Sequence, residues 1–319
     1  MSEHHDIGEL LRQSPRNWRR WGDQDEIGAL NLLTPEQVLA AVRHVRSGKV
    51  FTLAIPIGSP GGDPVWPGRA APEKHMTVDK SHFSAERRRR YPGDSEFADD
   101  WIGMYLQGST QVDALGHMWF GDELYNGYPA QSTVGGLRHC SVERIAEHGI
   151  VGRGVLLDIA RHRGERSLGP GDAVTVQDLE GAAAAQGVEV QKCDILLLRT
   201  GWIGVFYERG PEAFYVKPFS EPGLAYSPQL VDWFHEHDIV CLVTDTIANE
   251  ITQDPQTGWV ATLHIALMVN LGIVFSEIVA LDQLADDCAQ DGQWDFLYAA
   301  APLRVVEGAG APVNPIVIK

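Results

Sequence analysis

The chain has 319 residues, of which 44% are hydrophobic and 22% are charged, so it is long and apolar enough to bury a sizeable core. Its formal net charge of −17 would repel nucleic-acid phosphates and anionic lipid surfaces, which argues against nucleic-acid and membrane partners. Four cysteines without a Cys-x-x-Cys pair argue against a disulfide framework and a thiolate zinc site.

The first predicted element is a helix. Residues 34–37, T-P-E-Q, have the pattern of a helix N-terminus, with a capping threonine and a proline at the first helical position. A helix is therefore predicted over 35–47, ending at Gly48. Residues 50–57 are predicted to form a strand. The stretch 58–101 is rich in proline, glycine and charge, and is predicted to be irregular.

Strand and helix patterns alternate along the rest of the chain. Strands are predicted at 154–159, 195–199 and 239–244, and helices at 176–186, 228–237 and 262–271. Such alternation favours an α/β fold with a single mixed sheet. No internal repeat or Gly/Ser linker divides the chain, so one domain is predicted over 1–319, with 1–17 as an extension. The sequence lacks the glycine-rich fingerprints of dinucleotide and P-loop sites.

The first residues of the sequence and its apolar runs bear on the cellular compartment of the protein. Residues 1–20 are polar and lack the apolar segment of a signal peptide. The longest apolar stretch, 265–274, is far shorter than a bilayer span. We therefore expect a cytoplasmic protein.

The densest group of reactive side chains lies between Gln107 and His117, in Q-G-S-T-Q-V-D-A-L-G-H. If the backbone is extended as far as Asp113, alternate residues from Gln107 onward face the same side. Two carboxamides, a hydroxyl and a carboxylate would then lie side by side, with an imidazole four residues later. These side chains could therefore all face one cavity.

His264 and Glu277 form a second candidate pair, with an apolar helix and a turn at Gly272 between them. A histidine inside such a helix is more often a core or capping residue than a metal ligand. An imidazole buried near a carboxylate would nevertheless supply, together with Asp113, three ligands suited to a divalent cation. Both interpretations stay open at this point.

Aromatic residues gather near His117. Most aromatic side chains pack in cores or between subunits, but one or two could form a flat slot for an aryl substrate. Trp119 and Tyr125 are the candidates because they closely follow His117, and Trp101 is a third. The loops at 58–101 and 204–220 would set the remaining shape of a pocket.

The run T-Q-V-D-A-L-G-H at 110–117 resembles the signature of the cyclase superfamily, which includes bacterial kynurenine formamidase and isatin hydrolase. That signature is usually written H-x-G-T-H-x-D-x-x-x-H. Further matches follow in order at R-T-G-W (199–202), P-G-L (222–224), D-T (245–246), His264 and Glu277. Together with D-E-I-G-A-L-N at 25–31, the likeness extends from about residue 18 to residue 284. Each short match is weak alone, whereas the ordered set is specific.

The resemblance implies a swivelling β/β/α domain of the cyclase type, in a homodimer or homotetramer. It implies that Asp113, His264 and Glu277 are metal ligands and that His117 is a general acid/base. The chain departs from the signature where Gln107 and Gln111 replace the two motif histidines and serine replaces the motif glycine.

A carboxamide oxygen is a weaker ligand than an imidazole nitrogen, so the replacement of two motif histidines by glutamine should weaken metal binding. We expect one divalent ion, Mn²⁺ or Zn²⁺ with Mg²⁺ as a third choice, and a metal-free state is the alternative.

By this resemblance the chain is a kynurenine formamidase-like (arylformamidase-like) amidohydrolase. It would hydrolyse a carbon–nitrogen bond of an amide, formamide or lactam, or an ester, with metal-activated water and His117 as the base. The substrate would be a small aromatic or cyclic molecule. Two alternatives stay open: a non-hydrolytic polyketide-type cyclase or isomerase, in which Gln107 and Gln111 stabilise an oxyanion, and a metal-free binding protein on the same fold.

Overall fold

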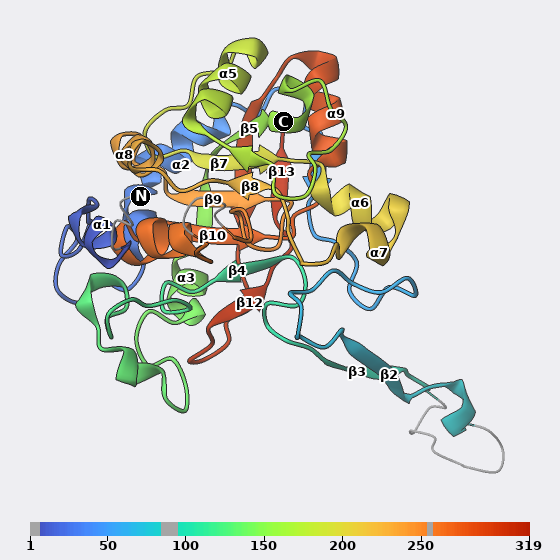
Figure 1. Cartoon of the computed structure of the whole chain (residues 1–319). Helices are drawn as coiled ribbons and strands as arrows, with labels where there is room; N and C mark the ends of the chain where they lie inside the picture. Colours follow the sequence, from blue (N-terminus) through green and yellow to red (C-terminus); the bar gives the residue numbers. More distant parts are fainter. Residues whose placement is uncertain (1–6, 84–94, 254–257) are drawn as a thin grey trace.

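The computed structural model describes residues 7–83, 95–253 and 258–319. Its centre is one mixed sheet of nine strands in the order β1-β13-β11-β5-β7-β9-β10-β4-β12 (Figure 1). These strands are β1 (Val50–Thr52), β4 (Gln111–Asp113), β5 (Ile150–Asp158), β7 (Ile195–Arg199), β9 (Cys241–Thr244), β10 (Val274–Glu277), β11 (Asp295–Ala300), β12 (Gly310–Pro312) and β13 (Ile316–Ile318).

The strands β5, β7, β9 and β10 run parallel to one another, and the pairs on either side of them are antiparallel. Parallel strands are normally covered on both faces, which explains why β7 reads as the continuous apolar run I-L-L-L and is fully buried. The predicted α/β fold with a single mixed sheet is confirmed. β7 has its predicted bounds.

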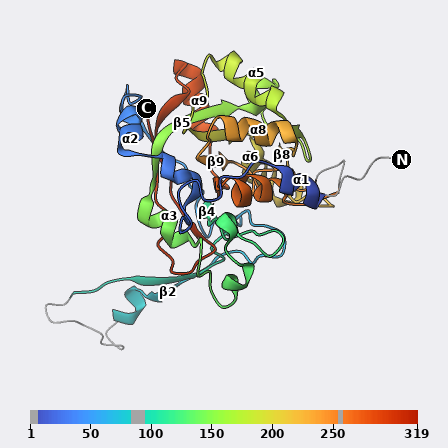
Figure 2. The same ribbon diagram turned by 90° about the vertical axis from the view of Figure 1, so that its left-hand side faces the viewer.

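Helices surround the sheet, as Figures 1 and 2 show. They are α1 (Ile7–Gln13), α2 (Pro35–Val42), α3 (Val142–His148), α4 (Ile159–His162), α5 (Val176–Gln186), α6 (Trp202–Arg209), α7 (Pro211–Phe214), α8 (Pro228–Glu236) and α9 (Asp282–Asp291), with 3₁₀ turns η1 (Gly28–Leu32), η2 (Lys80–Phe83), η3 (Tyr125–Gly127) and η4 (Ala130–Thr133). α5 matches its prediction, whereas α2 ends at Val42, before the predicted 47. Among the described residues, no helix is long and apolar enough to cross a membrane.

The predicted helix at 262–271 is mainly the wider π-helix η5 (His264–Asn270). A π-turn inserts an extra residue into the helical ladder and is frequent at functional sites. The predicted helix is thus present at its predicted position, and its π geometry is what the sequence pattern did not show.

A two-stranded hairpin interrupts the stretch 58–101 that was predicted to be irregular. β2 (Glu73–Val78) pairs with β3 (Asp99–Gly103), and the hairpin projects from the body in both views (Figures 1 and 2); residues 84–94 lie outside the description. Most side chains of both strands are exposed, so no apolar alternation marks them in the sequence. The predicted homo-oligomer stays a prediction.

A second small sheet pairs β6 (Ala173–Val174) with β8 (Gly223–Leu224). It lies beside the main sheet through an isolated bridge from Leu224 to Glu250, just after β9. Gly223 is required at this contact, because a Cβ atom there would lie 2.5 Å from the backbone of Glu250. The P-G-L match at 222–224 therefore has a packing explanation.

The ends of β7 and β9 are tied together by Asp245. One carboxylate oxygen accepts hydrogen bonds from the backbone and hydroxyl of Thr200, at 2.8 and 2.6 Å, and the other accepts from Gly201 N at 2.6 Å. Gly201 has φ +75, and a Cβ atom there would lie 2.4 Å from Arg166 O. The R-T-G-W and D-T segments are thus joined by hydrogen bonds, which gives both matches a structural role.

The N-terminal segment is held by Asp25, which accepts hydrogen bonds from Gly28 N, Asn31 Nδ2 and the Tyr125 hydroxyl at 3.1, 2.7 and 2.7 Å. Part of the predicted extension 1–17 also packs on the domain, since the backbone oxygen of the buried Leu11 accepts a hydrogen bond from Asn270.

We predict that Asp245→Asn lowers the free energy of unfolding by about 1–3 kcal/mol, because an amide group would point one N–H donor at the Thr200 or Gly201 donors. Urea denaturation would measure the change. Asp286→Asn is the matched control, because the Asp286 side chain is 79% exposed and its ion pair should contribute little. Equal stability of the two variants would contradict the role assigned to Asp245.

Candidate active site

Strands β4 and β10 place three polar side chains on one face of the sheet. They pair in antiparallel register, with Gln111 opposite Glu277 and Asp113 opposite Phe275. Directly opposed residues of an antiparallel pair share a face, and so do alternate residues along a strand. Gln111, Asp113 and Glu277 therefore point into the same space. All three are buried.

His264 enters this space from the first position of the π-helix η5. Glu250 fixes it with three hydrogen bonds: its oxygens accept from Leu263 N at 2.8 Å, from His264 N at 2.9 Å, and from the His264 ring at Nδ1 at 2.6 Å. A carboxylate on Nδ1 fixes the orientation of the ring and leaves Nε2 to face the site. The ring also packs edge-on against Phe275, with centroids 4.9 Å apart.

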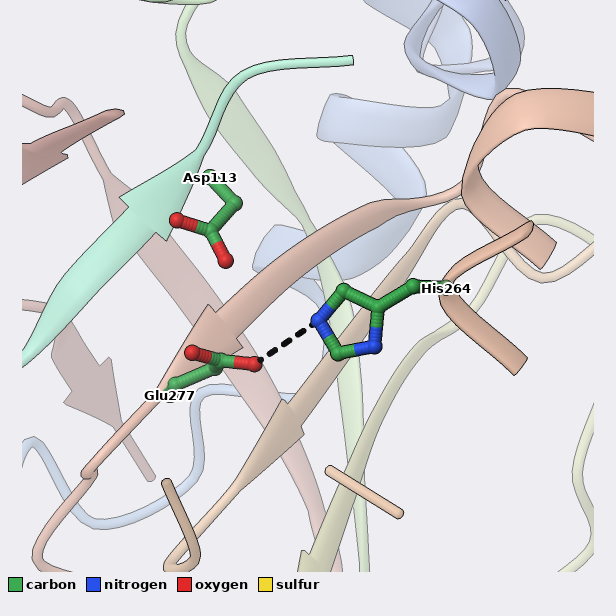
Figure 3. A group of neighbouring side chains, drawn as sticks. All are labelled: Asp113, His264 and Glu277. Carbon is green, nitrogen blue, oxygen red and sulfur yellow. Dashed lines mark ion pairs between the residues drawn. The ribbon is translucent and has the colours of Figure 1, made fainter. Parts of the chain in front are cut away.

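Asp113, His264 and Glu277 converge on one point, as Figure 3 shows. One ligand atom from each lies within 4.8 Å of the others, and His264 Nε2 is 3.4 Å from Glu277 Oε1. Two ligands with bonds of about 2.0–2.2 Å to one ion lie up to roughly 4 Å apart. The cluster is thus slightly wider than a shared ion requires. The three predicted metal ligands form a possible metal site.

Glu277 is held from two sides. Its Oε2 accepts a hydrogen bond from Gln111 Nε2 at 2.8 Å, and its Oε1 accepts one from Asn249 Nδ2 at 3.0 Å. Asn249 is in turn fixed by the Thr244 hydroxyl, at 2.7 Å. The carboxylate therefore has a defined orientation before any ligand arrives.

The charges in this cluster do not balance. Burial alone would lower the pKa of His264, but hydrogen bonds to Glu250 and Glu277 outweigh it and raise the pKa to about 10. Burial and the adjacent Asp113 charge raise the pKa of Glu277, although its hydrogen bond to His264 opposes them. One imidazole faces three buried carboxylates, so a cation would compensate the excess negative charge.

Two acceptor atoms in the cluster also lack partners. Asp113 Oδ1 and Gln111 Oε1 are buried and have no hydrogen bond within the described part of the chain. Buried polar atoms are usually paired, and a bound ion or water is a common partner for an atom that lacks one within the protein. The oxygen-rich donor set, with one imidazole, fits a borderline or hard divalent cation.

Gln107 reaches the same space from a turn, and a bend at 108–110 separates it from β4, so the predicted extended strand begins only at Gln111. A Cβ atom on Gly310 would lie 2.7 Å from Gln107 Nε2 and 3.1 Å from Asp113 Oδ1, which places both atoms against this glycine. Gln107 Nε2 is buried and lacks a partner among the described residues. It is thus a free donor beside the Asp113 carboxylate.

Two basic side chains complete the surroundings of the site. His117 is half-buried after β4; burial lowers its pKa, while the charge on Asp113 raises it. A lowered pKa leaves the imidazole neutral at pH 7 and able to accept a proton. Arg69 Nη1 donates to Gln107 O at 3.0 Å, and its charge lowers the pKa of both His117 and Glu277.

The three predicted aromatic contacts lie in different places. Tyr125 is fully buried and its hydroxyl binds Asp25, so its side chain is used within the protein and is not carried forward as a substrate contact. Trp101 lies on the projecting hairpin, where its ring packs at an angle of 34° against His75. Trp119 is about half exposed, and its substrate contact stays a prediction.

The structure adds four residues that the sequence reasoning missed: Asn249, Glu250, Arg69 and Gly310. Asn249 and Glu250 directly follow D-T-I-A, after a buried strand, where polar side chains often form sites in α/β sheets. Their position just after a buried strand could have predicted both residues from the sequence. Arg69 and Gly310 carry no local signal.

Comparisons with known proteins point to one family. A family model described as "Putative cyclase" matches residues 51–250. A solved structure described as a novel cyclase is 39% identical, with a TM-score of 0.86 over 96% of this chain and 100% of that chain. The chain covers that relative completely. No curated protein matches significantly.

Two more distant solved structures share the fold. Isatin hydrolase A from Ralstonia solanacearum is 19% identical, with a TM-score of 0.62 over 89% of this chain and 97% of that chain. A predicted metal-dependent hydrolase from Bacillus stearothermophilus is 15% identical, with a TM-score of 0.50 over 84% and 97%.

We predict that Glu250→Gln lowers the pKa of His264, because it removes the carboxylate that stabilises the protonated ring. An NMR titration of the ring resonances would measure the change in metal-free protein. Glu73→Gln, an equal charge change on the exposed hairpin, should leave that pKa unaltered. An unchanged titration in Glu250→Gln would show that Glu250 does not control the ring.

Proposed function

Because the chain belongs to the putative cyclase family, we propose that it is a metal-dependent hydrolase of an amide, formamide or lactam, or of an ester. One observation supports this most: the buried cluster of Asp113, His264 and Glu277, with its excess negative charge and the unpaired Asp113 oxygen. Burying a charged cluster of this kind lowers the stability of the protein unless a bound ligand compensates the charge.

In this proposal Asp113, His264 and Glu277 hold one divalent ion, Mn²⁺ or Zn²⁺ in preference to Mg²⁺. The unpaired Gln111 oxygen is a further acceptor beside them. Such an ion supplies Lewis acidity and brings the pKa of a bound water to about 7. The remaining chemistry belongs to the side chains.

His117 serves as the proton carrier of the reaction. Its neutral imidazole accepts a proton from the attacking water and returns it to the leaving nitrogen or oxygen. Gln107 Nε2, a buried donor without a partner among the described residues, is available for the oxygen that becomes negative when water adds to the carbonyl. The site would thus contain a base and an oxyanion donor.

Within this reaction class, the more specific proposal is a kynurenine formamidase-like activity on an aromatic or cyclic substrate. The fold shared with isatin hydrolases supports this choice, since isatin is a cyclic aromatic amide. Hydrolysis of formyl-anilides, lactams and cyclic imides, with and without Mn²⁺, is the direct assay.

A second candidate function is a polyketide-type cyclase or isomerase. The free Gln107 donor favours it, because an enolate oxygen needs such a donor as much as a tetrahedral intermediate does. In that reaction His117 would remove a carbon-bound proton, and no water would be consumed. Product analysis by mass spectrometry separates the two, since only hydrolysis adds the mass of water.

We predict that Asp113→Asn and His117→Ala fail in different ways. Asp113→Asn should lose both the metal and activity, because it removes a ligand charge. His117→Ala should keep its metal and lower kcat by about a hundredfold or more, the usual range for a lost general base. Metal analysis beside a rate assay checks both. Loss of metal in His117→Ala would make His117 a ligand instead.

We also predict that replacing Gln107 and Gln111 together by His raises zinc affinity, because imidazole binds zinc better than a carboxamide does. The two glutamines contact or adjoin Glu277 and Asp113, so both new rings would face the cluster. Metal titration with a rate assay measures the effect. Tighter zinc with lower native activity would assign an oxyanion role to the glutamines. Unchanged affinity would contradict their placement.

A further inference from the structure

An aromatic cavity of about 560 Å³ lies beside the candidate active site. Four aromatic side chains line it: Trp66, Phe206, Tyr215 and Phe219. Its walls come from 61–71 and 206–219, within the two loops expected to shape a pocket. Small-molecule sites commonly measure about 300–1,000 Å³ and are mainly apolar, with few polar groups.

The aromatic walls are held in place before any ligand binds. Trp66 and Phe219 pack edge-to-face with centroids 5.6 Å apart, and Tyr215 packs against Phe219 at 5.8 Å. The Tyr215 hydroxyl accepts a hydrogen bond from Val65 N and donates one to Val65 O, both at 2.8 Å. A preformed slot of this kind costs little entropy to fill.

Arg69 joins this cavity to the active site. Its side chain lines the cavity, and its Nη1 donates to the backbone oxygen of Gln107, whose own side chain lies against Gly310 beside Asp113. A guanidinium has five N–H donors, and this hydrogen bond uses one. The others have no hydrogen-bond partner within the described residues, so they are available at the boundary between the two spaces.

The charges around the cavity favour an anion. Arg69 and Lys217 are its cations, and Asp63 is its one acid. The Asp63 carboxylate already accepts hydrogen bonds from Gly58 N and Ser59 N at 2.6 and 3.1 Å. This balance is opposite to the net charge of −17 of the whole chain.

We propose that the substrate is an aromatic carboxylate, whose ring occupies this cavity and whose carboxylate pairs with Arg69, so that its hydrolysable bond lies towards Asp113. The inference rests on the proposed function and specifies its substrate class. A guanidinium recognises a carboxylate through two parallel hydrogen bonds, and a one-ring or two-ring aromatic group suits the volume.

Calorimetric titration of the full chain with 2-naphthoate and its uncharged analogue 2-naphthamide tests the proposal. The protein is treated with a chelator, so that the carboxylate cannot bind a metal. We expect naphthoate to bind at least about tenfold more tightly than naphthamide, the effect of one charged hydrogen-bonded pair. Equal affinities would overturn the inference.

Variants locate the binding. Arg69→Gln should abolish the preference for naphthoate and leave the affinity for naphthamide within about twofold, whereas Arg69→Lys should keep part of the preference. Lys217→Met removes the second cation of the cavity and should reduce the preference less than Arg69→Gln does. Arg46→Gln, the same substitution at an exposed arginine outside the cavity, is the matched control and should keep all of it. Trp66→Ala should weaken both probes. A preference that survives Arg69→Gln, or that depends on Lys217 instead, would overturn the assignment.

The result is separable from the proposed hydrolysis, because binding is measured without metal or turnover. An Arg69-dependent preference in a protein that hydrolyses nothing would support the aromatic carboxylate site and refute the proposed function. Metal-dependent hydrolysis by a protein that binds the two probes equally would support the proposed function and refute the aromatic carboxylate site.

Discussion

The hydrogen bond between Glu250 and the ring of His264 is the constraint on which the candidate site depends. The same carboxylate accepts from two backbone amides at the start of η5, so one side chain sets both the beginning of that helix and the direction of the imidazole. Without it, His264 would be an ordinary polar residue in an apolar helix. With it, Nε2 is directed at Glu277 and the ring cannot turn without breaking a buried contact.

The sheet contributes the opposite half of the site at no extra cost in chain entropy, since β4 and β10 are already ordered by their ladder. Their antiparallel register brings Gln111 and Glu277 together and leaves Asp113 beside Gly310 of β12. The site is therefore divided between a rigid sheet and a helix fixed by one carboxylate. Such a division gives a preorganised charge cluster, and the aromatic cavity beyond Arg69 provides apolar surface next to it.

Sequence reasoning succeeded where the signal was local. The bounds of α5 and β7 match their predictions, and in the structure α5 begins at a local capping box while β7 is an apolar run. The period of two also correctly placed Gln111 and Asp113 on one face. It failed where tertiary contacts decide the outcome. The alternation does not extend back to Gln107, because the chain bends there. Glu250, Arg69 and Gly310 acquire their roles only through residues distant in the sequence, and the hairpin β2–β3 is exposed on both faces, so it carries no apolar pattern.

The position of β4 also governs the order in which the molecule can be assembled. This three-residue strand pairs with β10 and β12, which follow it by more than 150 residues. At the other edge of the sheet, β1 likewise pairs with the distant β13. Contacts so distant along the chain slow folding, because a large loop must close before any pairing energy is gained. During synthesis the Asp113 segment would therefore stay unpaired until β10 and β12 have left the ribosome. A nascent chain of this protein therefore leaves the Asp113 segment without its strand partners for longer than a chain whose strands pair locally.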